Sequence, residues 1–166
     1  MPPRSAPPLD VTVRPLTVAD GPFLQSLLRH LVWVPPGAPA PPADVARRAE
    51  VARYAAGWGR PGDAGVAAVA EGQPIGAAWV RRWTGDDRGY GFVDAATPEL
   101  SIGLLPGWRG RGIGTRLLRR VLAVTPDVSL SVSLGNPARR LYEREGFEAT
   151  GEPAGGSITL ARRAGR

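Results

Sequence analysis

The hydrophobic and polar positions of this chain follow the spacing of a β-strand in some stretches and that of a helix in others. The change from strand to helix spacing is sharpest around residue 106. Residues Glu99–Leu105 are β-forming and end at Pro106, which cannot donate to a strand ladder. Further on, apolar residues recur three or four positions apart, at Ile113, Leu117, Leu118 and Val121. This spacing is typical of one buried helix face. The pattern therefore predicts a strand, a glycine-rich turn over residues 108–114 and a helix.

A second strand and helix are predicted immediately downstream. Leu130, Val132 and Leu134 alternate with serines over residues 129–134, as in a strand with one apolar face. Asn136 is then a favoured N-cap, and Pro137 suits the first helical position. Ala138, Leu141 and Tyr142 share one face of the predicted helix, which Gly146 terminates.

The rest of the chain supplies the other elements of a mixed α/β domain. We expect a strand at 11–15, a helix from 17–20 through Leu31, a proline-rich break at 33–42 and a second helix over Ala43–Trp58. Strands at 65–70 and 74–83 read as a hairpin, and Thr84–Ala96 as a polar loop. Residues 147–162 can add an antiparallel pair that turns at 151–157 and closes with a strand at 157–160. We expect one domain, 11–162, with a flexible proline-rich tail at 1–10 and a C-terminal tail at 163–166.

Composition narrows the chemistry. The 166 residues include no cysteine, which excludes disulfides, thiolate metal sites and a cysteine nucleophile, and His30 is the only histidine. No metal site is therefore expected. The net charge of +6 comes from arginines alone, dispersed mostly in pairs on predicted helix faces. No apolar run is long enough to span a bilayer, and the N-terminus lacks the apolar core of a signal peptide, so we expect a cytoplasmic protein without a membrane partner.

The glycine-rich turn before the helix at Ile113 is a candidate anion site. A helix start offers free backbone N–H groups, and glycines let a phosphate approach them. A P-loop is excluded because the chain has no lysine, and the dinucleotide fingerprint fails at Thr115, where a third glycine or alanine belongs. Arg109, Gly112 and Gly114 do match the signature Arg/Gln-x-x-Gly-x-Gly/Ala. The alternative is a structural turn with solvated arginines.

With Asn-Pro-Ala-x-x-Leu-Tyr-x-x-x-Gly-Phe over residues 136–147, this signature resembles the GNAT family of acetyl-CoA-dependent N-acetyltransferases. The resemblance implies a three-layer mixed α/β fold with flanking helices. Its central sheet would be mostly antiparallel, with the strands at 99–105 and 129–134 splayed apart. It also implies transfer of an acetyl group from acetyl-CoA to a primary amine of a small molecule or protein, and GNAT domains often form homodimers through their closing strands.

The resemblance also implies roles for single residues. Those expected to bind the cofactor are Ile102, Gly103, Leu104, Arg109, Gly110, Arg111, Gly112, Ile113, Gly114, Thr115 and Asn136. Tyr142 would be the general acid toward the leaving thiolate, or else a core tyrosine. Alternation places Glu99 on one strand face with Ser101 and Gly103, where several GNAT members carry a general base. Otherwise Glu99 is an exposed strand-entry residue.

The sequence does not identify the amine that would accept the acetyl group. Trp33, Tyr54 and Trp58 are candidates for the acceptor wall or for packing against the sheet, and the acids at 86, 87 and 94 are expected to be solvated. Three rival functions stay open: a non-catalytic acyl-CoA sensor, a nucleotide-binding oxidoreductase and a basic nucleic-acid-binding module.

Overall fold

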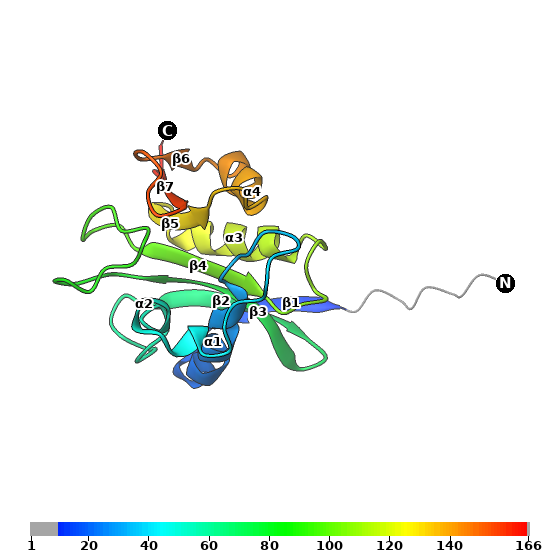
Figure 1. The fold of residues 1–166 in the computed structure, drawn as a ribbon. Coiled ribbons are helices and arrows are strands. Elements are labelled where there is room, and N and C mark those ends of the chain that lie inside the picture. Colours follow the sequence, from blue (N-terminus) through cyan, green and yellow to red (C-terminus); the bar gives the residue numbers. More distant parts are fainter. Residues whose placement is uncertain (1–9, 166) are drawn as a thin grey trace.

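A seven-stranded sheet separates two helical layers in the computed structural model, which describes residues 10–165 (Figure 1). The strands lie in the order β1-β2-β3-β4-β5-β7-β6. Their bounds are β1 Val11–Pro15, β2 Ala64–Ala70, β3 Gln73–Arg81, β4 Glu99–Leu104, β5 Val128–Ser133, β6 Glu148–Ala149 and β7 Ser157–Arg162.

The helices divide between the two faces of the sheet (Figure 1). On one face lie α1 (Gly21–Leu27) and α2 (Ala49–Ala52), with the 3₁₀ turns η1 (Val18–Asp20), η2 (Leu28–His30) and η3 (Val45–Arg47). On the other lie α3 (Ile113–Val124) and α4 (Ala138–Arg144). Each face has its own core: Leu117, Leu118 and Val121 of α3 pack on one side, and Leu24 and Leu27 of α1 pack against Trp79 on the other. The predicted three-layer fold is confirmed.

The central feature of the sheet is the divergence of β4 from β5. Every other neighbouring pair of strands is antiparallel, whereas β4 and β5 are parallel and share only the residue pair Glu99 and Ser129. Beyond Glu99 the β5 edge of β4 has no strand partner, so its backbone groups there stay free for another hydrogen-bonding partner. The predicted splay is therefore present, and it opens toward the turn that precedes α3.

Most predicted elements are found close to their expected bounds. The strand at 11–15, the hairpin of β2 and β3, the strand–turn–helix unit and the closing strand β7 are all confirmed. The helix expected between residues 17 and 31 is present as η1, α1 and η2 in succession.

The helix predicted over Ala43–Trp58 is wrong. Only η3 and the four-residue α2 form there, because Arg48 between them has an extended backbone (φ −67°, ψ 137°). After α2 the chain runs in turns, and its carbonyl groups bond to β3 instead: the Arg81 guanidinium donates to the oxygens of Arg53 and Ala56, and the Trp79 indole donates to that of Tyr54. Hydrogen bonds to the sheet have replaced helical ones.

The chain ends are described only in part. The predicted N-terminal tail at 1–10 lies outside the described residues except for Asp10. The predicted C-terminal tail starts where β7 ends, and Arg163 at its start donates to the Thr97 hydroxyl at 2.6 Å. Within residues 10–165, each helix is too short or too polar to cross a lipid bilayer.

Candidate functional site

One cavity of about 860 Å³ is lined by β4 and β5 where they diverge. At one end it reaches Arg109 and Gly114, at the start of α3. At the other it reaches Tyr54 and Tyr90, beyond the buried end of β4. Its size is within the range of small-molecule sites, which is roughly 300–1,000 Å³. Two substrates entering from opposite ends would meet between the two strands.

The turn before α3 leaves a row of backbone donors unpaired. Gly110 and Gly112 have φ values of +74° and +76°, a left-handed conformation that favours glycine. Gly112 is the N-cap of α3 and makes no side-chain cap, so the first N–H groups of the helix lack an internal acceptor. Among residues 10–165, no backbone oxygen accepts from the N–H groups of residues 110–115. With the positive end of the helix dipole, these donors suit an anion.

Gly114 has no reason to be glycine within the fold itself. It is the second residue of α3, its φ is not positive, and a Cβ added there would meet nothing within 4 Å. Glycine inside a helix is less stable than alanine by about 0.5–1 kcal/mol. Because Gly114 lines the cavity, the space beside it is open to a ligand.

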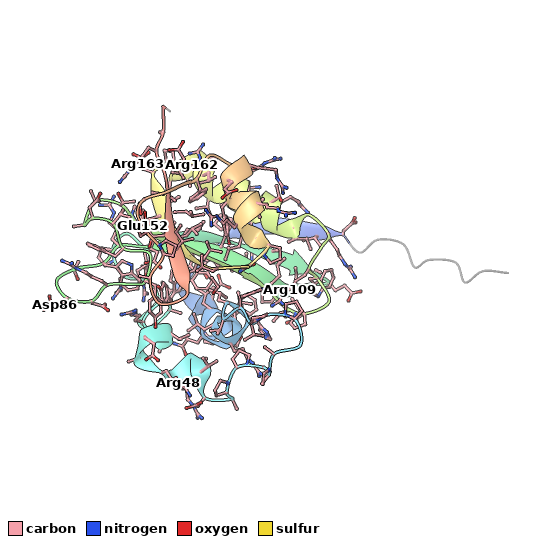
Figure 2. The ribbon with its side chains drawn as sticks, turned by 45° about the horizontal axis from the view of Figure 1, so that its top comes forward. Arg48, Asp86, Arg109, Glu152, Arg162 and Arg163 are labelled. Atoms are coloured by element: carbon pink, nitrogen blue, oxygen red, sulfur yellow. The ribbon has the colours of Figure 1, made fainter. Side chains whose placement is uncertain are left out.

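Cationic side chains surround the same end of the cavity. Arg109 lies beside the loop that follows η2, and its guanidinium donates to the His30 carbonyl at 3.2 Å (Figure 2). Arg29 also lines the cavity, and burial together with the charges of Arg29 and Arg109 lowers the pKa of His30. Arg111 instead stacks its guanidinium 5.0 Å from the centre of the Trp108 ring. Arg109 therefore reaches the cavity, whereas Arg111 flanks it.

Helix α4 brings Tyr142 into the wall. The Asn136 side chain accepts a hydrogen bond at 2.9 Å from the N–H of Ala138, the first residue of α4, and the N-cap of the helix is Pro137, one residue later than predicted. Tyr142 is 8% exposed, and its ring meets Phe147 edge-on at 5.8 Å. Its hydroxyl makes no hydrogen bond within residues 10–165, although the side chain lines the cavity. Burial raises the pKa of Tyr142 to about 12, so it remains a proton donor over the working pH range.

Glu99 is a buried carboxylate at the opposite end of the cavity. It is only 2% exposed, and its Oε1 accepts from the Trp83 indole at 3.2 Å and the Gly91 N–H at 3.0 Å. Burial raises the pKa of Glu99 to about 7, while hydrogen bonding from Tyr54, Trp83 and Gly91 and the charge of Arg53 act in the opposite direction. The alternative of an exposed strand-entry residue is excluded. A carboxyl with a pKa near neutrality is suited to accept a proton.

Contacts of its hydroxyl and of its ring hold Tyr54 beside Glu99. Its hydroxyl accepts from the Tyr90 N–H at 2.7 Å, and its ring meets Trp83 edge-on at 5.3 Å. Gly89 packs so closely that a Cβ there would overlap the Glu99 carboxylate and the Tyr54 hydroxyl. Burial and the negative charge of Glu99 both raise the pKa of Tyr54.

A buried ion pair anchors the segment that carries Tyr54. The Arg81 guanidinium donates to both carboxylate oxygens of Asp63, at 3.0 and 2.8 Å, and the two side chains are 1% and 2% exposed. The remaining Arg81 donor, Nη1, binds the backbone oxygens of Arg53 and Ala56 at 2.8 and 2.7 Å. Strand β3 therefore holds the Tyr54 segment in place through fully paired groups.

The structure divides the predicted site residues into two sets. Those that line the cavity are Glu99, Ile102, Gly103, Leu104, Arg109, Gly114, Asn136 and Tyr142. Those that build the turn and helix start without lining it are Gly110, Arg111, Gly112, Ile113 and Thr115. The Ile113 side chain is buried in the core, so only its backbone N–H is available to a ligand.

Two of the three candidates for the acceptor wall line the cavity. Trp33 and Tyr54 line the cavity, but Trp58 does not, because its indole donates to the Thr17 carbonyl at 2.9 Å. Asp86 lies at the outer tip of its loop, far from the cavity (Figure 2). Sequence reasoning missed Trp83, Tyr90 and Gly91 as neighbours of Glu99. Their only signal was the concentration of aromatic residues and glycines between residues 83 and 92.

Among the residues that the structure describes, no group of three or more His, Cys, Asp or Glu side chains is placed to hold a metal ion.

Comparisons with solved structures agree with the fold. The chain superposes on PaiA N-acetyltransferase from Thermoplasma acidophilum, a coenzyme A complex, with a TM-score of 0.62 and 15% identity over 93% of this chain and 99% of that one. Ribosomal-protein-alanine N-acetyltransferase from Brucella melitensis gives 0.60 and 22% over 91% and 98%. The yncA protein of Salmonella typhimurium, solved with acetyl-CoA, gives 0.60 and 19% over 93% of each chain.

No curated protein matches this chain in sequence. A family model described as the acetyltransferase (GNAT) family does match, over residues 26–147. That span runs from the end of α1 to residue 147, just before β6, and includes the strands β4 and β5 that form the walls of the cavity. The enzyme class that follows is an acyltransferase with acetyl-CoA as co-substrate, and the chain belongs to the acetyltransferase (GNAT) family.

Proposed function

We propose that this protein transfers the acetyl group of acetyl-CoA to a primary amine of a small molecule or protein, using Glu99 and Tyr142. The observation that carries the proposal is the continuity of the cavity. A single space joins the unpaired N–H groups at the start of α3 to a buried carboxylate whose pKa is about 7. An anion holder and a proton acceptor at opposite ends suit a two-substrate transfer.

The α3 end fits the pyrophosphate of acetyl-CoA. Free N–H groups of residues 110–115, the Arg109 guanidinium and the open space beside Gly114 converge there. Ile102, Gly103 and Leu104 offer the unpaired edge of β4 to an extended amide-bearing chain. Acetyl-CoA supplies the activated thioester carbonyl, and the residues of this chain hold and orient it.

The Glu99 end fits the amine. Attack forms the nitrogen–carbon bond of the amide, breaks the carbon–sulfur bond and requires the amine to lose a proton. Glu99 accepts that proton directly or through water, because a base with a pKa near the working pH is half ionised and still strong enough. Trp83 and Gly91 both donate to its Oε1, which fixes the orientation of the carboxylate.

Tyr142 assists departure of the thiolate from the other side. Its hydroxyl has no protein partner within residues 10–165, so it is free to donate a hydrogen bond to the sulfur. An ordinary thiol has a pKa of roughly 8.5, which makes it a stronger acid than Tyr142 at about 12. Tyr142 therefore acts by hydrogen-bond donation that strengthens as charge develops on sulfur, rather than by a complete early proton transfer.

The first experiment is calorimetric titration with acetyl-CoA, CoA and NAD, followed by a thiol-release screen over amine classes. We expect micromolar binding of the two CoA ligands, weakened by Arg109→Ala and unchanged by Arg47→Ala, an exposed arginine away from the cavity. Acetyl-CoA binding without thiol release on any amine would favour a non-catalytic sensor. Absence of CoA binding would overturn the proposal.

A further inference from the structure

An arginine without a carboxylate partner lies beside the Glu99 end of the cavity. The Arg53 guanidinium carbon lies 5.1 Å from the centre of the Tyr90 ring and 5.8 Å from that of Tyr54. Its Nε is buried and has no hydrogen-bond partner, and its other nitrogens form no ion pair or hydrogen bond within residues 10–165. Tyr54 and Tyr90 line the cavity, and Arg53 is not itself among the lining residues, so its guanidinium lies against the two rings of the cavity wall.

Two other arginines are each paired with a buried carboxylate. Arg14 is paired with Asp20 at 2.8 Å, and Arg81 with Asp63 at 2.8 Å. A buried guanidinium nitrogen without an acceptor is unfavourable, by roughly 1–3 kcal/mol or more for a charged group. Of Arg14, Arg53 and Arg81, only Arg53 therefore has a guanidinium that is still free to bind a ligand.

The charges around this end of the cavity do not suit a polycation. Arg48, which lines the cavity, lies 3.5 Å from Asp44, and both are half exposed. Glu50 is exposed, and Glu99 is only half ionised near pH 7. Arg48 and Asp44 offset each other, and Arg53 offsets Glu50, so only the partly neutral Glu99 remains to face a cation. This balance favours an acceptor with one ammonium group over polyamines, which carry several.

We propose that the acceptor carries a carboxylate as well as its amine, and that Arg53 binds the carboxylate while Glu99 faces the amine. The inference rests on the proposed function, since it assigns the substrate class of the same cavity. Guanidinium and carboxylate form paired, charge-assisted hydrogen bonds, which an alkylammonium does not match in geometry. The acceptor class is an amino acid or a similarly small amino carboxylate.

The arrangement sets the size of this acceptor. Tyr54 contacts Arg53 through its ring and faces Glu99 through its hydroxyl, so one tyrosine side chain separates the two charged groups. A molecule with a few carbons between its amine and its carboxylate spans that separation. The rings of Tyr54 and Tyr90 would contact those carbons.

The competing explanation is that Arg53 serves Glu99 alone. Its positive charge already favours the ionised carboxylate of Glu99. In that case a change at Arg53 would alter the pH dependence of kcat/KM equally for every acceptor. It would not distinguish an acceptor with a carboxylate from one without.

The test uses matched pairs of amino acid and decarboxylated amine: β-alanine and ethylamine, 4-aminobutyrate and propylamine, lysine and cadaverine. Binding of each to the CoA-saturated protein is measured by calorimetry, and kcat/KM is measured by thiol release from acetyl-CoA. The variants are Arg53→Gln and, as a charge-matched control, Arg47→Gln, which changes an exposed arginine outside the cavity.

We expect at least one pair in which the amino acid binds tenfold or more tightly than its amine. Arg53→Gln should abolish that difference through the dissociation constant and KM, and Arg47→Gln should retain it. Equal or weaker binding of every amino acid, or a uniform loss on all acceptors in Arg53→Gln, would overturn the inference. The proposed function stands or falls separately, on whether any amine releases CoA from acetyl-CoA.

Discussion

Replacing Gly114 with alanine is expected to stabilise the fold while it weakens acetyl-CoA binding. The new Cβ would meet no atom within 4 Å, and the backbone is already helical, so the substitution adds no clash and no strain. The gain in helix propensity is about 0.5–1 kcal/mol. For a domain of this length that gain corresponds to a rise of about 1–4 °C in Tm.

The same methyl group would stand where an anion approaches the N–H groups of the α3 turn. We expect a loss of about tenfold in affinity, which is about 1.4 kcal/mol, and a larger loss for Gly114→Val. Differential scanning calorimetry without ligand measures the first effect, and titration calorimetry with acetyl-CoA measures the second. For this one substitution, Tm should rise while the affinity for acetyl-CoA falls.

Two controls separate the ligand effect from a general glycine effect. Gly151→Ala is a matched substitution in open space at a residue without positive φ, remote from the cavity, and should leave acetyl-CoA affinity unchanged. Gly112→Ala should lower Tm, because its φ of +76° disfavours a side chain by about 1–2 kcal/mol. If Gly114→Ala binds acetyl-CoA as tightly as the wild type, the open space beside Gly114 is not a ligand site.

Three further predictions follow from the contacts of the site. Tyr142→Phe removes no protein hydrogen bond, so Tm should be nearly unchanged while kcat falls about 10²–10⁴-fold; unchanged kcat in steady-state thiol release would exclude its role. Glu99→Gln should remove the rise in kcat/KM that the wild type shows through about pH 7. Because folding raises the pKa of Glu99, its stabilising neutral form is lost as pH rises from about 4.5 through 7, so the wild type alone should lose about 3 kcal/mol of unfolding free energy over that range. Asp63→Asn leaves the buried Arg81 unpaired and should cost about 3–5 kcal/mol, a fall of about 6–20 °C in thermal unfolding; a fall below about 2 °C would mean that solvent or another group compensates.

The sequence predicted the parts of the site that depend on local pattern. Strand β4, the turn with Gly110 and Gly112, and helix α3 are all encoded by the spacing of apolar residues and the positions of glycines between residues 99 and 124. The hydrogen bond that the Asn136 side chain accepts from the Ala138 N–H, at the start of α4, is equally local. Such features depend on neighbours along the chain, which a single sequence displays directly.

The surroundings of Glu99 were not predictable in the same way. Tyr54, from the turns after α2, and Trp83 and Gly91, from the connection between β3 and β4, reach its carboxylate, and no periodicity relates them. The failed helix over Ala43–Trp58 has the same origin. Its alanine-rich pattern is compatible with a helix, but Arg81 and Trp79 of β3 bind the carbonyl groups of residues 53, 54 and 56. Tertiary hydrogen bonds decided that conformation.

Two glycines of the cavity wall show why the structure was needed to interpret the motif. A Cβ at Gly103 would overlap the Cδ1 atom of Leu31, the residue that follows η2, so packing against β4 favours glycine there. Gly114 lines the same cavity, yet its Cβ would extend into open space and would make the helix more stable. One glycine is therefore explained by the fold and the other is not. Since a glycine that weakens its own helix needs a compensating role, and since free N–H donors surround it, Gly114 is the residue whose identity argues most directly for a bound anion.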